Sequence, residues 1–223
     1  MTPAASRWMA VGGLLGLSIA AIGAMHTGAG RQLLARLGVP CPVDQVDAAQ
    51  VTRLREAGLR DARGLGTAPA RPALGMVLGR TTREDVRAWQ AAHRAECVEL
   101  VRGATYLRCR GVAADAFGVA GPPVSEAWFS FGPDGRLAGV DLYRRGLDDP
   151  GAVQAWSDAQ ARLARALGTP TRAFGDASPR VLHASALQTA RLEYRYRDYL
   201  AVVTAVNLPH AGLAVREQYI DAR

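Results

Sequence analysis

The sequence contains no lysine. All 27 of its basic side chains are arginine, and Asn207 is the only asparagine in 223 residues. Because lysine and asparagine both have AT-rich codons, their joint scarcity indicates a GC-rich genome as much as selection for anion binding. A formal charge of +7 would otherwise favour nucleic acid or an anionic membrane surface. The arginines are scattered among Asp and Glu without any basic run, so we expect a solvated surface and no nucleic-acid partner.

The residue patterns of common catalytic and metal sites are also missing. No Cys-x-x-Cys or His-x-x-x-His spacing occurs, which argues against zinc. No Ser/His/Asp or Cys/His order is recognisable, and no glycine loop is suited to a phosphate. The adjacent carboxylates Asp148 and Asp149 are better placed to start a helix than to act as an acid and base. We therefore expect a protein that is not an enzyme and has no cofactor, metal or small-molecule substrate.

The longest apolar run lies near the N-terminus. Trp8 to Met25 are eighteen residues without a charge, which as a helix would span about 27 Å, enough to cross a lipid bilayer. Residues 1–30 are predicted to form an uncleaved signal anchor, with a cleaved secretory signal as the alternative. The expected location is the inner (cytoplasmic) membrane, in a single pass, with the C-terminal part in the periplasm.

The chain has few cysteines, and two of them lie close together. Cys97 and Cys109 flank a turn containing Gly103, a spacing typical of two adjacent strands. In an exported protein a disulfide is expected for such a pair, and it would contribute about 3 kcal/mol. Two buried thiols are the alternative. Cys41 is left over, as a solitary thiol or an intermolecular link.

Turn and helix signals divide the remaining chain. Residues 31–70 are predicted to be a helical stalk, with an amphipathic helix from Asp44 to Leu59, and a Gly/Ala/Pro linker. Thr82 and Asp85 form a capping-box pattern at the start of a second helix. Strands are expected over residues 72–78, 97–101, 105–111, 125–131 and 137–143, the last two joined by a Pro-Asp-Gly turn.

The pattern then recurs at an offset of 67 residues. This offset places Trp89 on Trp156 in a helix that begins near Pro150, and the strand at 125–132 on residues 192–199. Further strands are expected over 200–208 and 213–219. The expected fold class is α+β: an N-terminal transmembrane helix, then a tandem repeat, residues 71–145 and 146–223, with helices packed on one face of an antiparallel sheet and the other face open.

Several short motifs resemble known families. Leu78-Gly79-Arg80-Thr81, a Cys97 to Cys109 hairpin ending in Cys-Arg-Gly, and Phe131-Gly132 resemble one repeat of the β-lactamase inhibitor protein. With Leu167-Gly168-Thr169-Pro170, the broader pattern is similar to the outer-membrane assembly lipoproteins of the SmpA/OmlA (BamE) type. The resemblance covers about residues 71–223. It implies a tandem αβ module whose open sheet is a partner-binding surface.

Strand alternation predicts which side chains the open face carries. A mixture of aromatic, arginine and carboxylate side chains favours protein binding over catalysis, with a solvated face of paired charges as the alternative. The expected function is that of a membrane-anchored periplasmic protein-binding module, which would act as an envelope-assembly factor or as an accessory subunit of a larger membrane complex. Its expected partners are other membrane or envelope proteins. The alternative function is that of a periplasmic enzyme inhibitor. The expected partner-binding residues are Glu126, Trp128, Tyr143, Arg195, Arg197 and Arg216.

Overall fold

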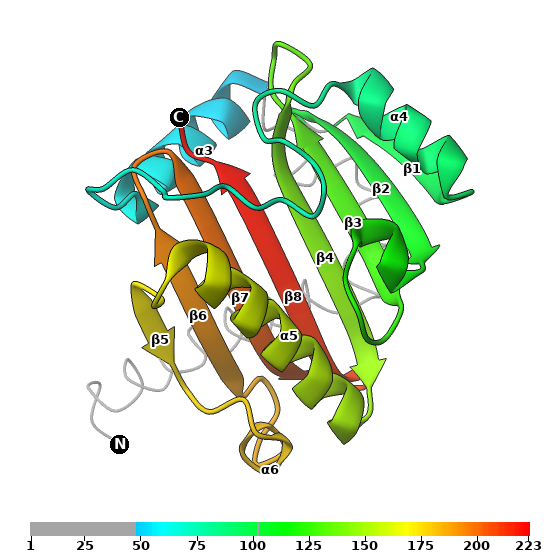
Figure 1. Ribbon diagram of the computed structural model, residues 1–223, viewed down its shortest axis with the longest axis vertical. Helices are drawn as coiled ribbons and strands as arrows, with labels where there is room; N and C mark the ends of the chain where they lie inside the picture. Colours follow the sequence, from blue (N-terminus) through cyan, green and yellow to red (C-terminus); the bar gives the residue numbers. More distant parts are fainter. Residues whose placement is uncertain (1–47, 102) are drawn as a thin grey trace, which may run out of the picture. The chain divides into compact units, whose positions relative to one another are not determined.

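The structure of the protein, a computed structural model, describes residues 48–101 and 103–223. These residues form α-helices, one 3-10 helix and strands that pair into a single sheet (Figure 1). The helices are α3 (Ala48–Ala62), α4 (Arg83–Ala92), η2 (Ala114–Phe117), α5 (Asp149–Leu167) and α6 (Pro179–Leu182). The strands are β1 (Glu96–Val101), β2 (Thr105–Val112), β3 (Val124–Phe131), β4 (Leu137–Leu147), β5 (Arg172–Phe174), β6 (Thr189–Arg195), β7 (Tyr199–Leu208) and β8 (Gly212–Asp221).

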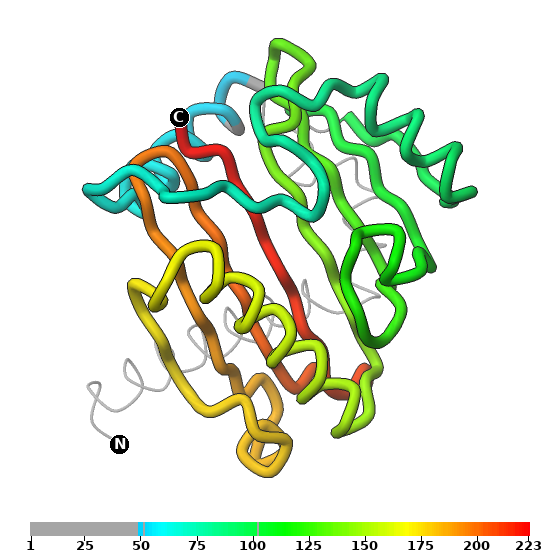
Figure 2. The backbone as a smooth tube through the Cα atoms, viewed as in Figure 1, coloured from blue at the N-terminus to red at the C-terminus, as the bar shows by residue number. Residues whose placement is uncertain are grey.

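The sheet is antiparallel and has eight strands in the order β1-β2-β3-β4-β8-β7-β6-β5. Each half of the chain forms four neighbouring strands, and β4 pairs with β8 in the middle, from Gly139 opposite Ile220 to Leu147 opposite Leu213. Figure 2 shows the backbone running up and down through these strands. The central strands are long, and both edge strands are short, which limits the exposed edge available for uncontrolled pairing.

The main core lies between the sheet and α5, which contacts β4, β7 and β8 (Figure 1). Leu163 of α5 and Leu142 of β4 are fully buried there. At the other end of the sheet, Trp89 of α4 stacks at 4.9 Å from Phe117 and donates its Nε1–H to the Ala116 carbonyl at 3.0 Å. This packing arises because apolar residues recur on one face of each helix and on one face of each strand, so the two apolar faces meet.

The local predictions for the first half are largely confirmed. Thr82 caps α4 through a complete capping box with Asp85, and the hydrogen bonds from Thr82 lower the pKa of the Asp85 carboxyl. β1 pairs with β2, and the predicted Cys97–Cys109 disulfide joins them at directly opposed positions. These features follow from residues close together in the sequence, which is why the pattern was sufficient to predict them.

The expected fold class is wrong. The described residues form one continuous sheet with few helices, and the two halves share it through the β4–β8 pairing instead of forming two tandem modules of helices on a sheet. Helices also do not lie on one face alone. Figure 1 shows α5 in front of the sheet, whereas α3 lies behind it at one end.

The 67-residue offset does not relate equivalent strands. A shift of 67 residues does carry α4 onto α5, but it moves β3 onto β6. These two strands are not equivalent, because β3 is the third strand from the β1 edge of the sheet and β6 is the second strand from the β5 edge. The helix α5 has 19 residues and α4 has 10, and α6 interrupts the second half between β5 and β6, so no single offset fits both.

The predictions of a transmembrane helix and of a location in the inner membrane are wrong as well. Within residues 48–101 and 103–223, no helix has both the length and the apolar character needed to span a bilayer. Trp8 to Met25, the run behind that prediction, lies outside the described residues, as does Cys41. The strand expected over residues 72–78 is also absent from the described chain, because this segment forms turns with positive φ at Leu74, Gly75 and Gly79.

Candidate interaction face

The sheet face turned away from α5 is called the outer face here. Arg162 of α5 bonds Glu217 and Tyr219 of β8, so Arg216 and Gln218 must point to the other side of the sheet. One cross-strand row on this outer face follows the register through six strands: Arg108, Trp128, Asp141, Gln218, Val202 and Glu193. Strand pairing thus brings residues from both halves of the chain into one surface.

Aromatic and arginine side chains alternate over β2, β3, β4 and β8 on this face. The guanidinium carbon of Arg108 lies 5.5 Å from the ring centre of Trp128. Tyr143 is flanked by Arg145 and Arg216, each 5.0 Å from its ring centre. Such cation–π contacts hold flat rings and guanidinium groups in fixed orientations. Together they form the arginine–aromatic patch: Tyr106, Arg108, Trp128, Tyr143, Arg145 and Arg216.

Two carboxylates lie within this patch. Glu126 accepts a hydrogen bond from Trp128 Nε1 at 3.2 Å and one from Arg145 at 3.3 Å. Asp141 accepts from Arg216 at 2.5 Å. Burial raises the pKa of the Asp141 carboxyl, and the positive charges of Arg216 and Arg55 oppose that rise. Arginines outnumber carboxylates, so the patch is basic although its charges are partly paired.

The structure brings four of the six predicted site residues together. Glu126, Tyr143 and Arg216 occupy directly paired positions on β3, β4 and β8, and Trp128 lies on the same face two residues after Glu126 on β3. Arg195 lies on the same face but on β6, where it bonds Glu193 at 2.6 Å. Whether these residues bind a partner is not decided by their positions, and that role stays a prediction.

Arg197 does not belong to the sheet face. The backbone N–H of Tyr196 bonds the Tyr199 carbonyl and closes the β6–β7 turn. In this turn the backbone of Arg197 donates to Gly66, and its guanidinium donates to Thr67 Oγ1 at 3.0 Å. The predicted strand runs to residue 199 but β6 ends at Arg195, and because strand alternation stops where a strand ends, it does not apply to Arg197.

Sequence reasoning missed Tyr106, Arg108 and Arg145. Alternation within residues 105–112 could have predicted Tyr106 and Arg108 on the outer face, because Leu107 and Cys109 are buried and the residues on either side of them are not. Arg145 follows the predicted end of its strand at residue 143, but β4 continues to Leu147 with a register shift. The longer strand places Arg145 beside Tyr143 and Glu126.

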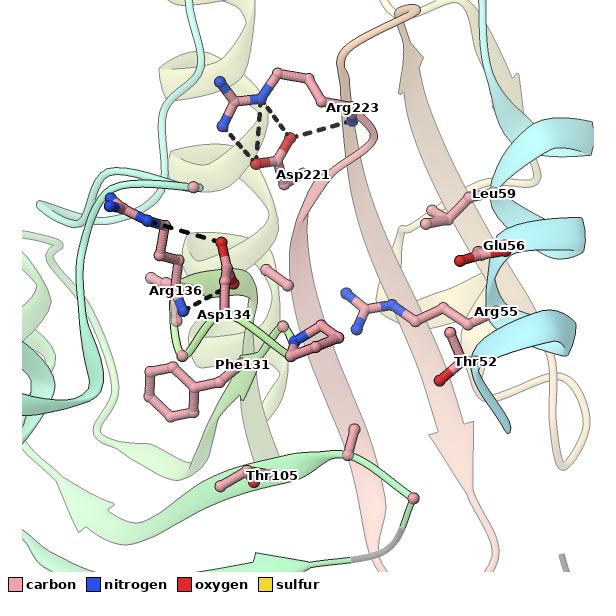
Figure 3. Close-up of a pocket in the computed structure, with 18 of the residues that line it drawn as sticks. Thr52, Arg55, Glu56, Leu59, Thr105, Phe131, Asp134, Arg136, Asp221 and Arg223 are labelled. Atoms are coloured by element: carbon pink, nitrogen blue, oxygen red, sulfur yellow. Dashed lines mark hydrogen bonds and ion pairs between the residues drawn. The ribbon is translucent and has the colours of Figure 1, made fainter. Parts of the chain in front are cut away.

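A cleft of about 860 Å³ lies at one end of the sheet (Figure 3). Arg55 extends into it from α3, toward the β3–β4 turn that carries Asp134 and Arg136. Two carboxylates of the cleft are engaged by arginines, Asp134 at 3.7 Å from Arg136 and Asp221 at 2.7 Å from Arg223. A third carboxylate, that of Glu56 on α3, also lines the cleft.

No cluster of three or more His, Cys, Asp or Glu side chains suited to a metal occurs in the described part of the chain. Comparisons with protein-family models, with curated proteins and with solved structures find no match to this chain. Its function must therefore be inferred from the arrangement of its own residues, and the arginine–aromatic patch is the most distinctive surface among them.

Proposed function

We propose that this protein is a non-enzymatic protein-binding module whose arginine–aromatic patch contacts an acidic surface of its partner. The observation that carries the proposal is Tyr143 held between Arg145 and Arg216, next to Trp128 on the neighbouring strand. Tyrosine, tryptophan and arginine are the residues most often responsible for binding energy at protein interfaces. Here all three types occupy adjacent positions on a rigid sheet.

The side chains of the patch are oriented before a partner arrives. Trp128 is fixed by its hydrogen bond to Glu126 and by Arg108 over its ring, and Arg216 is fixed by Asp141. Ordering a flexible side chain at an interface costs about 0.5–1.5 kcal/mol, so orientation in the free protein lowers that cost. Arg145 and Arg216 keep 43% and 41% of their side-chain surface exposed, which leaves donors for a partner.

The chemistry of the partner follows from the charge of the patch. Four arginines of the outer face, at 108, 110, 145 and 216, surround Glu126 and Asp141. Guanidinium groups bind carboxylates through two parallel hydrogen bonds, so an acidic protein surface with exposed Asp and Glu fits best. Such binding should weaken as salt is added, because exposed charges are screened.

The proposal can be tested with the full-length chain as bait in chemical cross-linking, with mass spectrometry to identify cross-linked proteins. Wild type should give one stoichiometric partner with acidic residues at the cross-linked surface. The double variant Trp128→Ala, Arg216→Ala should reduce its affinity at least tenfold, as expected for two central interface residues. Arg165→Ala, an exposed arginine of α5, is the matched control and should bind as wild type does.

A partner that binds the double variant with unchanged affinity would exclude the patch as the contact surface. The alternative function, enzyme inhibition, is favoured by one observation, the disulfide hairpin β1–β2 beside the patch, which the resembled inhibitor family shares in sequence pattern. Assaying purified hydrolases with and without the protein separates the two proposals. Inhibition that disappears in the double variant would favour the inhibitor.

A further inference from the structure

A second cavity lies on the α5 side of the sheet, away from the arginine–aromatic patch. It has a volume of about 660 Å³, is open to solvent, and is lined by the segment from Arg71 to Met76, by Trp89 of α4, by residues 116–118 and by Arg162 of α5. Ligand sites commonly measure about 300–1,000 Å³ and combine apolar walls with a few polar groups. The size and lining of this cavity agree with that description.

Arg162 supplies one polar group of the cavity. Its Nη2 donates to Glu217 and, at 3.1 Å, to the hydroxyl of Tyr219. Glu217 is also bonded by Arg144 at 2.6 Å and is 1% exposed, so one buried carboxylate is shared by two guanidinium groups. This group of residues therefore carries an excess positive charge. Within the part of the chain that the structure describes, the buried Nε of Arg162 has no hydrogen-bond partner.

Arg71 supplies a second polar group. Its Nη2 lies 3.1 Å from Asp221, but its buried Nε also has no hydrogen-bond partner among the described residues. Arg71 and Arg162 line the same cavity, and burial raises the pKa of the nearby Tyr199 hydroxyl, with the positive charges of both arginines opposing that rise. The same hydroxyl donates to the Pro72 carbonyl at 2.6 Å and fixes the wall next to Arg71.

The remaining walls are apolar. Leu74 and Phe117 are buried, and Met76 and Trp89 are half-buried beside them. Buried N–H groups of arginine are seldom left without acceptors in folded proteins, since the lost hydrogen bonds to water are not replaced. The side chains of Arg71 and Arg162 nevertheless keep 24% and 23% of their surface exposed, so a carboxylate in the cavity can reach them and balance the excess positive charge around Glu217.

We infer that this cavity is a binding site for a carboxylate attached to an apolar or aromatic body, with the carboxylate between Arg71 and Arg162 and the apolar body against Trp89 and Phe117. This site is separate from the proposed protein-binding patch, which lies on the other side of the sheet. Loss of one function by mutation should therefore leave the other intact.

The test uses 4-phenylbutyrate as probe and the uncharged 4-phenylbutyramide as its matched partner, titrated into the full-length protein by isothermal calorimetry. A charged hydrogen bond contributes about 1.5–3 kcal/mol, so the acid should bind at least tenfold more tightly than the amide. Arg71→Gln should weaken the acid at least tenfold and leave the amide unchanged. In NMR spectra, the indole N–H signal of Trp89, assigned with Trp89→Phe, should shift on addition of the acid.

Arg165→Gln is the control, because Arg165 is exposed on α5 one helical turn from Arg162. Arg162→Gln tests the second donor, and if that variant fails to fold, Arg71→Gln alone decides the matter. No binding of the acid at 10 mM, equal affinity for acid and amide, or equal affinity of Arg71→Gln and Arg165→Gln would each overturn the inference. An unchanged Trp89 signal in the presence of bound acid would place the ligand elsewhere and overturn it too.

Discussion

Glu217 and Glu193 are each bound by two arginines and lie on opposite faces of the sheet. Glu217 of β8 lies under α5 with Arg144 and Arg162, and Glu193 of β6 lies on the outer face with Arg191 and Arg195. Both carboxylates are almost fully buried, at 1% and 5% exposure. Their arginines differ, because Arg144 is 2% exposed whereas Arg191 is 45% exposed.

The difference shows what each face does. Under α5, Glu217 and Arg144 are closed off from water and depend on each other, while Arg162, 23% exposed, fixes the helix to β8. Removing Glu217 leaves the charge of Arg144 uncompensated. On the outer face Arg191 reaches water, which can replace a lost partner. The proposed exchange of ion pairs with a partner protein therefore fits Glu193 and its arginines better than the buried Arg144–Glu217 pair.

The largest expected effect is that of Glu217→Gln. The substitution keeps the shape of the side chain but leaves the buried charges of Arg144 and Arg162 without a counterion. Breaking a buried pair in this way costs about 3–5 kcal/mol. Urea unfolding of wild type and variant, followed by far-UV circular dichroism, measures the loss. A decrease in the free energy of unfolding of less than about 1 kcal/mol would show that water reaches these arginines. The two faces would then not differ in how well their charges are shielded from water.

The disulfide is expected to have the next largest effect. Cys97 and Cys109 are directly opposed on β1 and β2, and Cys109 is fully buried. Replacing both by alanine should lower the free energy of unfolding by about 3 kcal/mol, since the crosslink restricts the unfolded chain. Differential scanning calorimetry measures the shift. A reducing agent should lower the melting temperature of wild type by a similar amount and leave that of the double variant unchanged, and an equal shift in the double variant would contradict the assignment.

Glu193→Gln tests the comparison most directly. The same chemical change as in Glu217 should cost only about 1 kcal/mol here, because Arg191 reaches solvent when its partner is lost. Raising the salt concentration should reduce the difference between variant and wild type, since exposed charges are screened. Chemical denaturation with urea at low and high salt measures both effects. A loss as large as that of Glu217→Gln would mean that burial of the carboxylate alone sets the cost.

Arg145→Gln should have the smallest effect on stability. Arg145 lies over Tyr143 and 3.3 Å from Glu126 at a partly exposed site, where such contacts contribute about 0.5 kcal/mol. Its affinity for the proposed acidic partner should nevertheless fall several-fold. Urea unfolding and a binding titration on the same sample separate the two roles. A large stability loss with unchanged binding would make Arg145 a structural residue.

Some of the fold and the outer face could be read from the sequence because local rules decide them. The capping box at Thr82 needs only Asp85 three residues later, and the hairpin from β3 to β4 needs only its Pro-Asp-Gly turn. Strand alternation placed Trp128 and Tyr143 on one face. It failed at Arg197, where the strand had ended, and at residues 72–78, where positive φ values make turns of an apolar segment.

By itself, the sequence determined which side chains each strand presents to either face and which two cysteines are close enough to pair, since both depend on neighbours along the chain. Only the tertiary structure decided that β4 pairs with β8, that Glu217 is shared by Arg144 and Arg162, and that Arg71 pairs with Asp221. These contacts join residues dozens of positions apart. Their partners are chosen by the packing of α5 and by the closure of a single sheet, and no local periodicity encodes either.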